Sequence, residues 1–422
     1  MSKIVRILSR ILGCAFFAGL TFAVTTPLRA GDWATWRGPN LNGIAAEGQT
    51  PPVAWSDNKA IVWKTPVPGR GHSSPIVFGD RIFLTTADDS SQTQGVVAFD
   101  RFTGKQLWMV PVSQGGFPET HKKNTHATPS VACDGERLFV SFHHHGRIQV
   151  SALSLDGKRL WQQNVGNYDP QQYKYGYAPS PMLYQSRVLV CADYEGGGWI
   201  AALDGKSGET RWRVARPRKL SFSSPVVANI GGRDQLLISG TEQVASYDPN
   251  NGRQLWTTPA TTMATCGTMV WDGDLVFASG GYPKSETVCL NGRSGQLLWR
   301  NDQKCYEQSM LAFEGHVYAV TDRGIAYCWR AYDGTEMWSA RLEGGAVSSS
   351  PTLANGNIYS ANERGTFYVF KAQPTRFELV ARNQLGDEAF ATPSICDGQI
   401  YMRTAFNIGG SRQEWLYCIG SH

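Results

Sequence analysis

Short apolar runs separated by tight polar turns make up most of the chain from about residue 60 onward. One such pair reads Pro75-Ile76-Val77-Phe78, then the turn Gly79-Asp80, then Arg81-Ile82-Phe83-Leu84-Thr85. Runs of this length, rich in Val, Ile and Phe and bounded by Gly and Asp, predict β-strands joined by hairpin turns. The composition agrees, because 45 Gly, 14 Trp and only 18% charged residues are typical of a turn-rich β chain rather than a helical or disordered one.

A second pattern, Gly-x-x-x-Trp, recurs six times. It occurs at Gly104/Trp108, Gly157/Trp161, Gly208/Trp212, Gly252/Trp256, Gly295/Trp299 and Gly334/Trp338. Each Gly follows a short apolar strand and supplies the positive φ that the hairpin turn requires. Two more strands lie upstream of each hairpin. Each unit is therefore predicted to be a four-stranded antiparallel meander of about 40 to 50 residues, which is the signature of a β-propeller blade.

The units can be counted by a Pro that follows small polar residues at the inner strand. This mark occurs at Pro75, Pro129, Pro181, Pro225, Pro351 and Pro393, and Thr268 and Ser309 occupy the same place in two further units. The sequence therefore predicts an all-β fold, an eight-bladed β-propeller of four-stranded antiparallel blades over residues 55–422.

Two units depart from the pattern. The seventh has Val380 where the others have Trp, and the eighth ends at Tyr417-Cys418-Ile419 before any fourth strand. We expect residues 60–65 to pair with residues 415–419 as the outer strand of the last blade. This pairing by an amino-terminal strand would close the ring and remove an exposed sheet edge.

The stretch Ala98-x-Asp100-x-x-Thr103-Gly104-x-x-x-Trp108 resembles the tryptophan-docking motif of pyrroloquinoline quinone (PQQ)-like repeat propellers. Quinoprotein dehydrogenases and BamB-type envelope proteins share this motif. The resemblance covers about residues 55–420. It implies eight radially stacked blades, with each Trp wedged between neighbouring blades near the Gly of an adjacent unit. It implies no single function, because one fold hosts both enzymes and scaffolds.

The amino terminus has the layout of a secretory signal peptide. Basic residues precede an apolar run from Ile11 to Val24, and a small residue, Ala30, ends the segment. We therefore expect residues 1–30 to direct export, with cleavage near Ala30, and residues 31–54 to form an extension of the periplasmic or extracellular protein. The apolar run is shorter than the roughly 20 residues that span a bilayer, so we expect no stable membrane span in the mature chain.

The signal also carries most of the charge excess. The formal net charge of the whole chain is +5, but residues 1–30 hold four basic and no acidic residues. The remainder has 36 basic and 35 acidic residues. With its basic residues dispersed, this nearly neutral chain gives no electrostatic reason to expect a nucleic-acid partner.

The two faces of a propeller differ in their loops. Turns between the first and second strands and between the third and fourth strands share one face, the turn face. Links between blades and the second-to-third turns share the other, the loop face. Turn-face connections such as Gly79-Asp80 are short, whereas residues 111–125 and 166–177 form long loop-face links rich in His, Tyr and Lys. Because binding residues favour variable loops on a rigid scaffold, we expect function on the loop face.

The residue three before each inner-strand mark is expected to surround the channel mouth on this face. These residues are His72, His126, Ala178, Phe222, Thr265, Tyr306, Ser348 and Phe390. The candidate cofactor-binding or ligand-binding residues are Arg70, His72, His126, Phe222, Tyr306 and Phe390. Packing of the propeller axis is the alternative role for these side chains.

Six of the eight His residues lie between positions 72 and 145: His72, His121, His126, His143, His144 and His145. Imidazoles from neighbouring loops could supply three or four metal ligands. However, strand alternation places His143 and His145 on one side and His144 on the other, and no carboxylate partner stands close in sequence. We therefore predict exposed polar loop residues and no metal site. Cys266 and Cys305 could form a disulfide in an oxidising envelope, since both residues lie near the loop face at the two ends of the fifth unit.

Two classes of function remain. The chain has no adjacent Cys pair and no C-x-x-C-H haem motif. The calcium ligands and catalytic Asp that the quinoprotein resemblance implies cannot be matched residue by residue, so PQQ with calcium lacks residue support and no catalytic residue is predicted.

We therefore favour a monomeric, non-catalytic binding or scaffold protein whose partner is an envelope protein, a polysaccharide or a small ligand. The alternative is a PQQ-dependent alcohol or sugar oxidoreductase, with the quinone over the axis near Arg70, His72, His126 and Tyr306.

Overall fold

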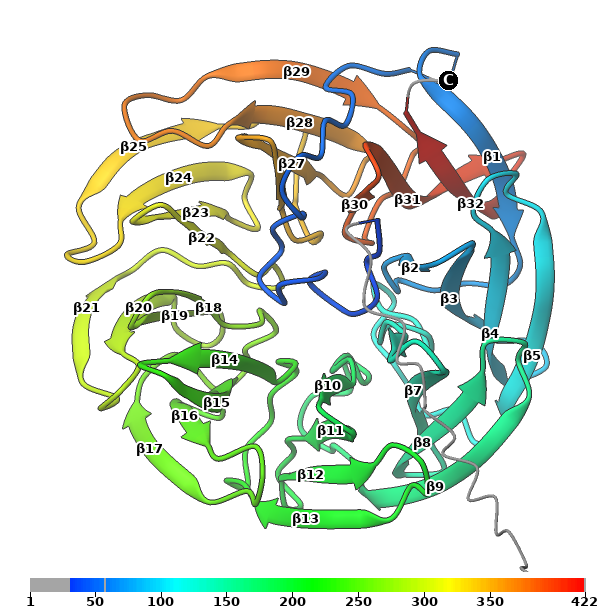
Figure 1. The fold of residues 1–422 in the computed structure, drawn as a ribbon, viewed down its shortest axis with the longest axis horizontal. Coiled ribbons are helices and arrows are strands. Elements are labelled where there is room, and N and C mark those ends of the chain that lie inside the picture. The colour runs from blue at the N-terminus through cyan, green and yellow to red at the C-terminus, as the bar shows by residue number, and fades with distance from the viewer. Residues whose placement is uncertain (1–30, 57, 421–422) are drawn as a thin grey trace, which may run out of the picture.

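A computed structural model describes residues 31–56 and 58–420 of the 422-residue chain. The predicted export signal, residues 1–30, lies outside the described residues. Thirty-two strands form eight four-stranded antiparallel sheets that surround a central axis (Figure 1). The predicted all-β, eight-bladed propeller is thus confirmed. The described part of the chain contains no helix that could cross a membrane.

Each blade runs from an inner strand at the axis to an outer strand at the rim. Blades 1 to 3 consist of β2 (Ile76–Phe78), β3 (Arg81–Asp88), β4 (Thr93–Asp100), β5 (Gln106–Gln114); β6 (Ala132–Cys133), β7 (Arg137–His144), β8 (Arg147–Ser154), β9 (Arg159–Asn167); and β10 (Met182–Tyr184), β11 (Arg187–Ala192), β12 (Trp199–Asp204), β13 (Thr210–Ala215). Blades 4 to 6 consist of β14 (Val226–Ile230), β15 (Arg233–Gly240), β16 (Gln243–Tyr247), β17 (Gln254–Pro259); β18 (Val270–Asp272), β19 (Leu275–Gly280), β20 (Glu286–Asn291), β21 (Leu297–Asn301); and β22 (Leu311–Phe313), β23 (His316–Val320), β24 (Ile325–Arg330), β25 (Glu336–Arg341). Blades 7 and 8 consist of β26 (Thr352–Ala354), β27 (Asn357–Ala361), β28 (Thr366–Lys371), β29 (Leu379–Gln384); and β30 (Ser394–Cys396), β31 (Gln399–Ile408), β32 (Ser411–Ile419), β1 (Ile61–Val67).

The hydrophobic pattern of a strand follows its place in the blade. In β12, a third strand, the first five residues are all buried, because neighbouring blades cover both of its faces. In β13, the outer strand of the same blade, half-buried residues alternate with exposed ones. The apolar cores therefore lie between the faces of neighbouring blades and end at the rim.

The Trp of the repeat joins each blade to the next. Trp108 Nε1 donates a hydrogen bond to Leu155 O at 3.1 Å, and its indole lies against Gly157, where an added Cβ would come within 3.0 Å of the ring. Trp63, Trp161, Trp212, Trp256, Trp299 and Trp338 donate in the same way to Arg101, Gly205, Pro249, Gly292, Ala331 and Gln373 O. The docking that the resemblance implied is confirmed, and Trp63 supplies it for the eighth blade.

The ring closes as the sequence predicts. Strand β1 pairs antiparallel with β32, with Ile61 opposite Ile419 and Thr65 opposite Leu416. The last blade is therefore assembled from both ends of the described chain, and its outer edge is covered.

Hydroxyl side chains join the inner ends of the blades around the axis. The backbone N–H of Ser74 donates to Ser130 Oγ at 2.9 Å. In the same way the backbone N–H of Ser130 donates to Ser180 Oγ, and that of Ser180 to Ser224 Oγ. The same kind of hydrogen bond runs from Thr268 to Ser309, from Ser309 to Ser350, from Ser350 to Thr392 and from Thr392 to Ser74. We call the residues that carry these hydroxyl groups the ring hydroxyls. These eight hydroxyl positions mark the same point of every blade and define the register at the axis.

The extension crosses the turn face at the axis (Figure 1). Trp33 pairs with Val77 of blade 1 through two backbone hydrogen bonds of 2.8 and 3.0 Å, and the backbone of residues 43–45 pairs with Leu353 of blade 7. Between them, the guanidinium of Arg37 is 1% exposed and donates to the carbonyls of Met310 and Pro351. This segment therefore docks on the propeller itself.

Candidate functional site

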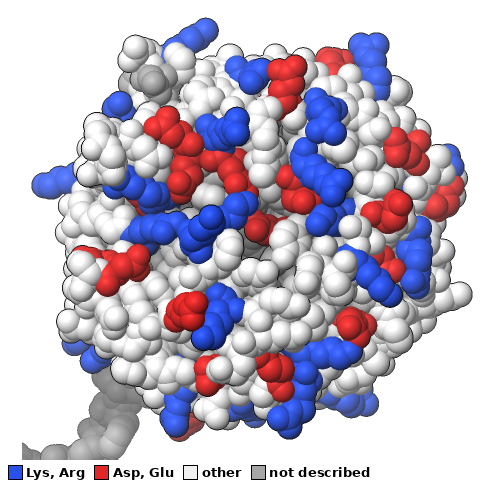
Figure 2. Space-filling view, turned by 180° about the vertical axis from the view of Figure 1, so that it is seen from behind, with Lys and Arg blue, Asp and Glu red and all other residues white. Residues whose placement is uncertain are grey.

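A cavity of about 500 Å³ occupies the axis and opens on the loop face. Figure 2, which shows that face, has acidic and basic side chains gathered around a central hollow. The residue two positions before each ring hydroxyl lines the cavity: His72, Thr128, Ala178, Phe222, Cys266, Glu307, Ser348 and Phe390. From the turn face the indole of Trp36 completes the lining, and its Nε1 donates to Thr268 Oγ1 at 2.9 Å.

Four of the six candidate residues meet in this cavity: His72, Phe222, Tyr306 and Phe390. The other two lie elsewhere. Arg70 pairs through its backbone with Ala87 and donates from Nη2 to Lys122 O at 3.1 Å. His126 lines a separate small cavity, and its ring packs on Phe117 with centroids 4.1 Å apart.

His126 lies outside the cavity because the sequence count started from the Pro of each unit. Pro75 follows its ring hydroxyl Ser74, whereas Pro129 precedes Ser130, so counting back from Pro129 reaches His126 instead of Thr128. In the sixth unit, which has no Pro there, the mark was the ring hydroxyl Ser309 itself, so counting back three residues reached Tyr306 instead of Glu307. Aligning the units on the hydroxyl residue rather than on Pro would have found the ring.

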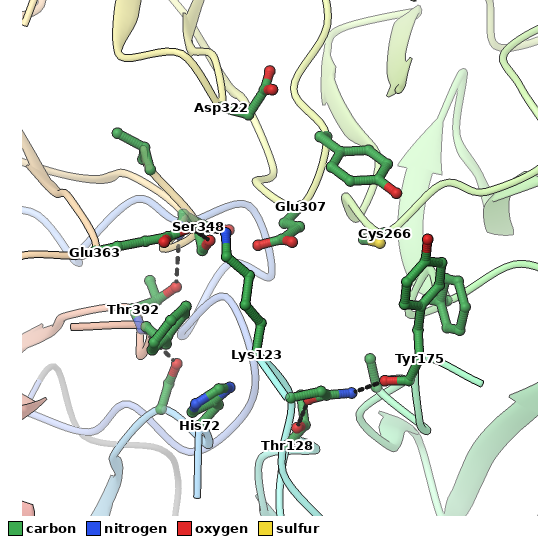
Figure 3. A pocket seen from close by; sticks show the side chains of 18 of the residues that line it. His72, Lys123, Thr128, Tyr175, Cys266, Glu307, Asp322, Ser348, Glu363 and Thr392 are labelled. Atoms are coloured by element: carbon green, nitrogen blue, oxygen red, sulfur yellow. Dashed lines mark hydrogen bonds and ion pairs between the residues drawn. The ribbon is translucent and has the colours of Figure 1, made fainter. Parts of the chain in front are cut away.

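Two lysines and three carboxylates in the cavity come from loops that sequence counting did not single out. Lys123 Nζ lies 2.8 Å from Glu363 Oε1, and Ser348 Oγ donates to the same oxygen at 2.7 Å (Figure 3). Lys304 Nζ lies 3.6 Å from Asp322 Oδ2 and donates to the Gly281 carbonyl at 3.3 Å. These side chains lie on links between blades and on second-to-third turns, the segments that form the loop face.

Glu307 is the carboxylate nearest the centre of this group. In Figure 3 its carboxyl group points toward the Lys123 ammonium. Burial raises the pKa of Glu307; Ser348 and Lys123 lower it, and the negative charges of Glu363 and Asp322 raise it further. Glu307 therefore holds its negative charge at a cost in free energy.

Burial holds the two potential nucleophiles of the cavity in their protonated form. Burial raises the pKa of the Cys266 thiol and of the Tyr306 phenol, so both keep their protons at neutral pH. Burial, followed by the charges of nearby Arg residues, lowers the pKa of His72 well below its ordinary value. The neutral imidazole stacks on Phe390, with ring centroids 4.3 Å apart.

The expectation that the His residues near position 145 are all exposed loop residues is wrong for His143. His143 is only 6% exposed and meets Tyr168 edge to face at 4.9 Å, so it is a core residue rather than an exposed loop residue. The strand ends at His144, and His145 adopts a positive φ of 49°, which breaks the alternation assumed from sequence. Over residues 31–56 and 58–420, no group of three or more His, Cys, Asp or Glu side chains is arranged to hold a metal ion. Cys266 and Cys305 are free thiols.

The cavity does not fit PQQ with calcium. The quinone carries several carboxylates and needs free cations, but Lys123 and Lys304 each face a carboxylate already. Glu307, Asp322 and Glu363 would repel it, and in the described part of the chain they do not converge as a metal-ligand set. No reaction step is therefore derived through this cofactor.

Comparison with known proteins places the chain in a family. The sequence model of the protein family described as outer membrane protein assembly factor BamB matches this chain over residues 44–175, 92–340 and 283–376. The chain is 23% identical over 348 residues to the outer membrane protein assembly factor BamB of Burkholderia pseudomallei, covering 72% of this chain and 85% of that protein.

Solved structures agree in fold. BamB from Moraxella catarrhalis superposes with a TM-score of 0.61 at 14% identity, over 86% of this chain and 98% of that one. A europium-containing methanol dehydrogenase superposes with a TM-score of 0.68 at 12% identity, over 93% of this chain and 98% of that one. At such low identity these likenesses concern the fold alone.

Proposed function

Because this chain belongs to the BamB family of outer membrane protein assembly factors, we propose that it is a non-catalytic scaffold of the bacterial envelope. Its loop face, centred on the axial cavity, is the surface that binds a partner protein. Export through residues 1–30, with cleavage near Ala30, is part of the same proposal; amino-terminal sequencing of the protein recovered from the envelope tests it.

One observation carries the proposal: the ionisable groups of the cavity are arranged for binding rather than for reaction. Lys123 and Lys304 face carboxylates, and burial keeps Cys266 protonated and His72 neutral. A nucleophile needs an adjacent base and a lowered pKa, and here the pKa of the thiol is raised. The cavity can therefore recognise charge and shape, while its thiol and phenol lack the activation that a nucleophile requires.

The extension decides which face is available. Residues 31–54 cross the turn face at the axis and Trp36 lines the cavity from that side, which favours approach of a partner from the loop face. The charged side chains around the hollow in Figure 2 lie on that surface.

Site-specific photo-crosslinking in the native cell tests this face. A photoreactive amino acid replaces Glu119, an exposed loop-face residue that pairs with Lys174, and separately Glu47, an exposed residue of the extension on the turn face. We expect a crosslinked product with an outer-membrane assembly protein from position 119 and none from position 47. Equal products from both positions, or none from position 119, would contradict the proposal.

The oxidoreductase alternative has its own test. The purified protein is mixed with micromolar PQQ and Ca²⁺, and bound absorbance and dye-coupled oxidation of alcohols and sugars are measured. We expect neither saturable binding nor turnover, because the cavity has unfavourable charge for the quinone. Saturable binding with turnover would replace the scaffold by an enzyme.

A further inference from the structure

We infer that the axial cavity receives a cationic side chain, Arg or Lys, from a loop of the partner polypeptide, held by Glu307 and Asp322 between aromatic walls. This inference rests on the proposed function and names the chemistry of the partner's contact.

The charge of the lining favours a cation. Glu307, Asp322 and Glu363 face two cations, Lys123 and Lys304, so the fully ionised lining has one negative charge in excess. Asp322 Oδ1 is buried and accepts no hydrogen bond from the described residues, while Oδ2 faces Lys304. A guanidinium or ammonium group would offset the excess charge and donate hydrogen bonds to the carboxylates that line the cavity.

The walls of the cavity suit the same group. Phe222, Phe390, Tyr175, Tyr306 and the indole of Trp36 line the space beside the carboxylates. Aromatic faces attract cations and pack against the methylene stem of a long basic side chain. A cavity of about 500 Å³ has room for one such side chain with the apolar residue beside it.

The surroundings of the opening indicate a polypeptide rather than a free amine. Tyr175 stacks on Tyr173, with centroids 5.7 Å apart, and Tyr173 meets Tyr282 edge to face at 5.6 Å. Tyr282 is 39% exposed, so this aromatic group continues from the cavity onto the loop-face surface. Tyr is enriched in protein interfaces, where its ring packs and its hydroxyl still meets water. A polypeptide would use both the cavity and this rim; a small amine would use the cavity alone.

Binding of a cation should release a proton. The pKa of Glu307 is raised by burial and by neighbouring carboxylates. A positive charge beside it lowers that pKa and favours the ionised carboxylate. The affinity for a basic side chain should therefore fall as the pH decreases through the raised pKa of Glu307.

Titration calorimetry with three probes tests the inference on the purified full chain. The probes are N-acetyl-Phe-Arg-amide, its neutral analogue N-acetyl-Phe-citrulline-amide, and cadaverine. We expect the arginine peptide to bind at least about tenfold more tightly than either of the others. Equal binding of the two peptides, or no binding of the arginine peptide at millimolar concentration, would overturn the inference. Binding of cadaverine as tight as that of the arginine peptide would overturn the assignment to a polypeptide.

Two conservative variants assign the effect to residues. Glu307→Gln and Asp322→Asn keep the shape of each side chain and remove its charge, and each should weaken binding of the arginine peptide by about tenfold. Asp169→Asn, an exposed loop-face carboxylate outside the cavity, is the matched control and should leave binding unchanged. Unaltered binding in both cavity variants, with circular dichroism showing a folded chain, would contradict the inference.

The crosslinking experiment separates the two proposals. If crosslinking from position 119 persists at full yield in the Glu307→Gln chain, the scaffold function stands and the cationic contact is wrong. If the unmodified chain gives no crosslink from position 119, the proposed function itself fails. We expect crosslinking that is specific to position 119 and reduced several-fold by Glu307→Gln.

Discussion

The indole of Trp55 stacks on the ring of Tyr359, with centroids 6.4 Å apart and an interplanar angle of 16°. Tyr359 lies on the second strand of blade 7. In blades 1 and 6 the corresponding residues, Phe83 and Tyr318, pack against the Trp of their own outer strand. Blade 7 has Val380 there, and the Trp that packs on its second strand comes instead from the segment just before the closing strand. The segment between the extension and β1 thus completes a blade that lacks its own Trp.

Replacing Trp55 by Ala should destabilise the protein by about 3 kcal/mol, because a buried indole is removed and the backbone around blade 7 cannot refill its volume. Trp55 is 4% exposed and also meets Phe367 edge to face at 5.5 Å. Urea unfolding followed by circular dichroism measures the change. Phe102→Ala, at a side chain that is 69% exposed, is the control and should shift stability by less than about 0.5 kcal/mol.

Deleting residues 55–66 removes Trp55, most of β1 and the docking Trp63. We expect the chain to unfold or aggregate, because β32 would become an exposed edge and the ring would lose its closure. Light scattering and thermal melting check this, with a chain starting at residue 31 as the control. A melting temperature equal to that of the control would contradict the role assigned to β1.

Replacing Arg37 by Met should loosen the extension. The buried guanidinium donates to the carbonyls of Pro351, Met310 and Asn42 at 3.0, 2.6 and 2.9 Å, and an apolar side chain leaves these acceptors unpaired. We expect faster proteolytic cleavage within residues 38–54 and a loss of about 2 kcal/mol in stability. Arg376→Met, at a side chain that is 76% exposed, should behave as the unmodified chain.

Stability should depend on pH through His143. Burial lowers its pKa from 6.5 to about 4, so the folded chain keeps this imidazole neutral while the unfolded chain takes up a proton. Folding free energy is therefore lost as the pH falls from about 6.5 toward 4, by up to about 3 kcal/mol from this residue.

His143→Phe keeps a ring against Tyr168 and cannot titrate, so the difference in unfolding free energy between pH 7 and pH 4 should shrink by about that amount. Urea titrations at the two pH values measure it, with the exposed His121→Gln as control. A variant whose pH dependence matched that of the unmodified chain would show that His143 does not carry the effect.

The sequence by itself determined the architecture. The turn glycines, the apolar strands and the Gly-x-x-x-Trp repeat are local signals, and each unit repeats them at nearly the same spacing. A blade contacts mainly its neighbours. The number of repeats and the extra strand predicted at residues 60–65, before the first unit, were therefore enough to predict eight blades and closure by β1. Four of the six candidate residues followed from the same count.

The tertiary structure decided which side chains meet at the axis. Lys123 and Glu363 are separated by 240 residues, lie on loops of different length and carry no repeat signal, yet their side chains form an ion pair. A two-residue difference in where Pro stands relative to the ring hydroxyl, one after Ser74 but one before Ser130, moved the counted position from Thr128 to His126. Burial of Glu307, Cys266 and His143, which sets their pKa values, likewise depends on packing across the ring. Repeats fix the backbone locally, but charge pairing and burial arise only once distant loops are brought together.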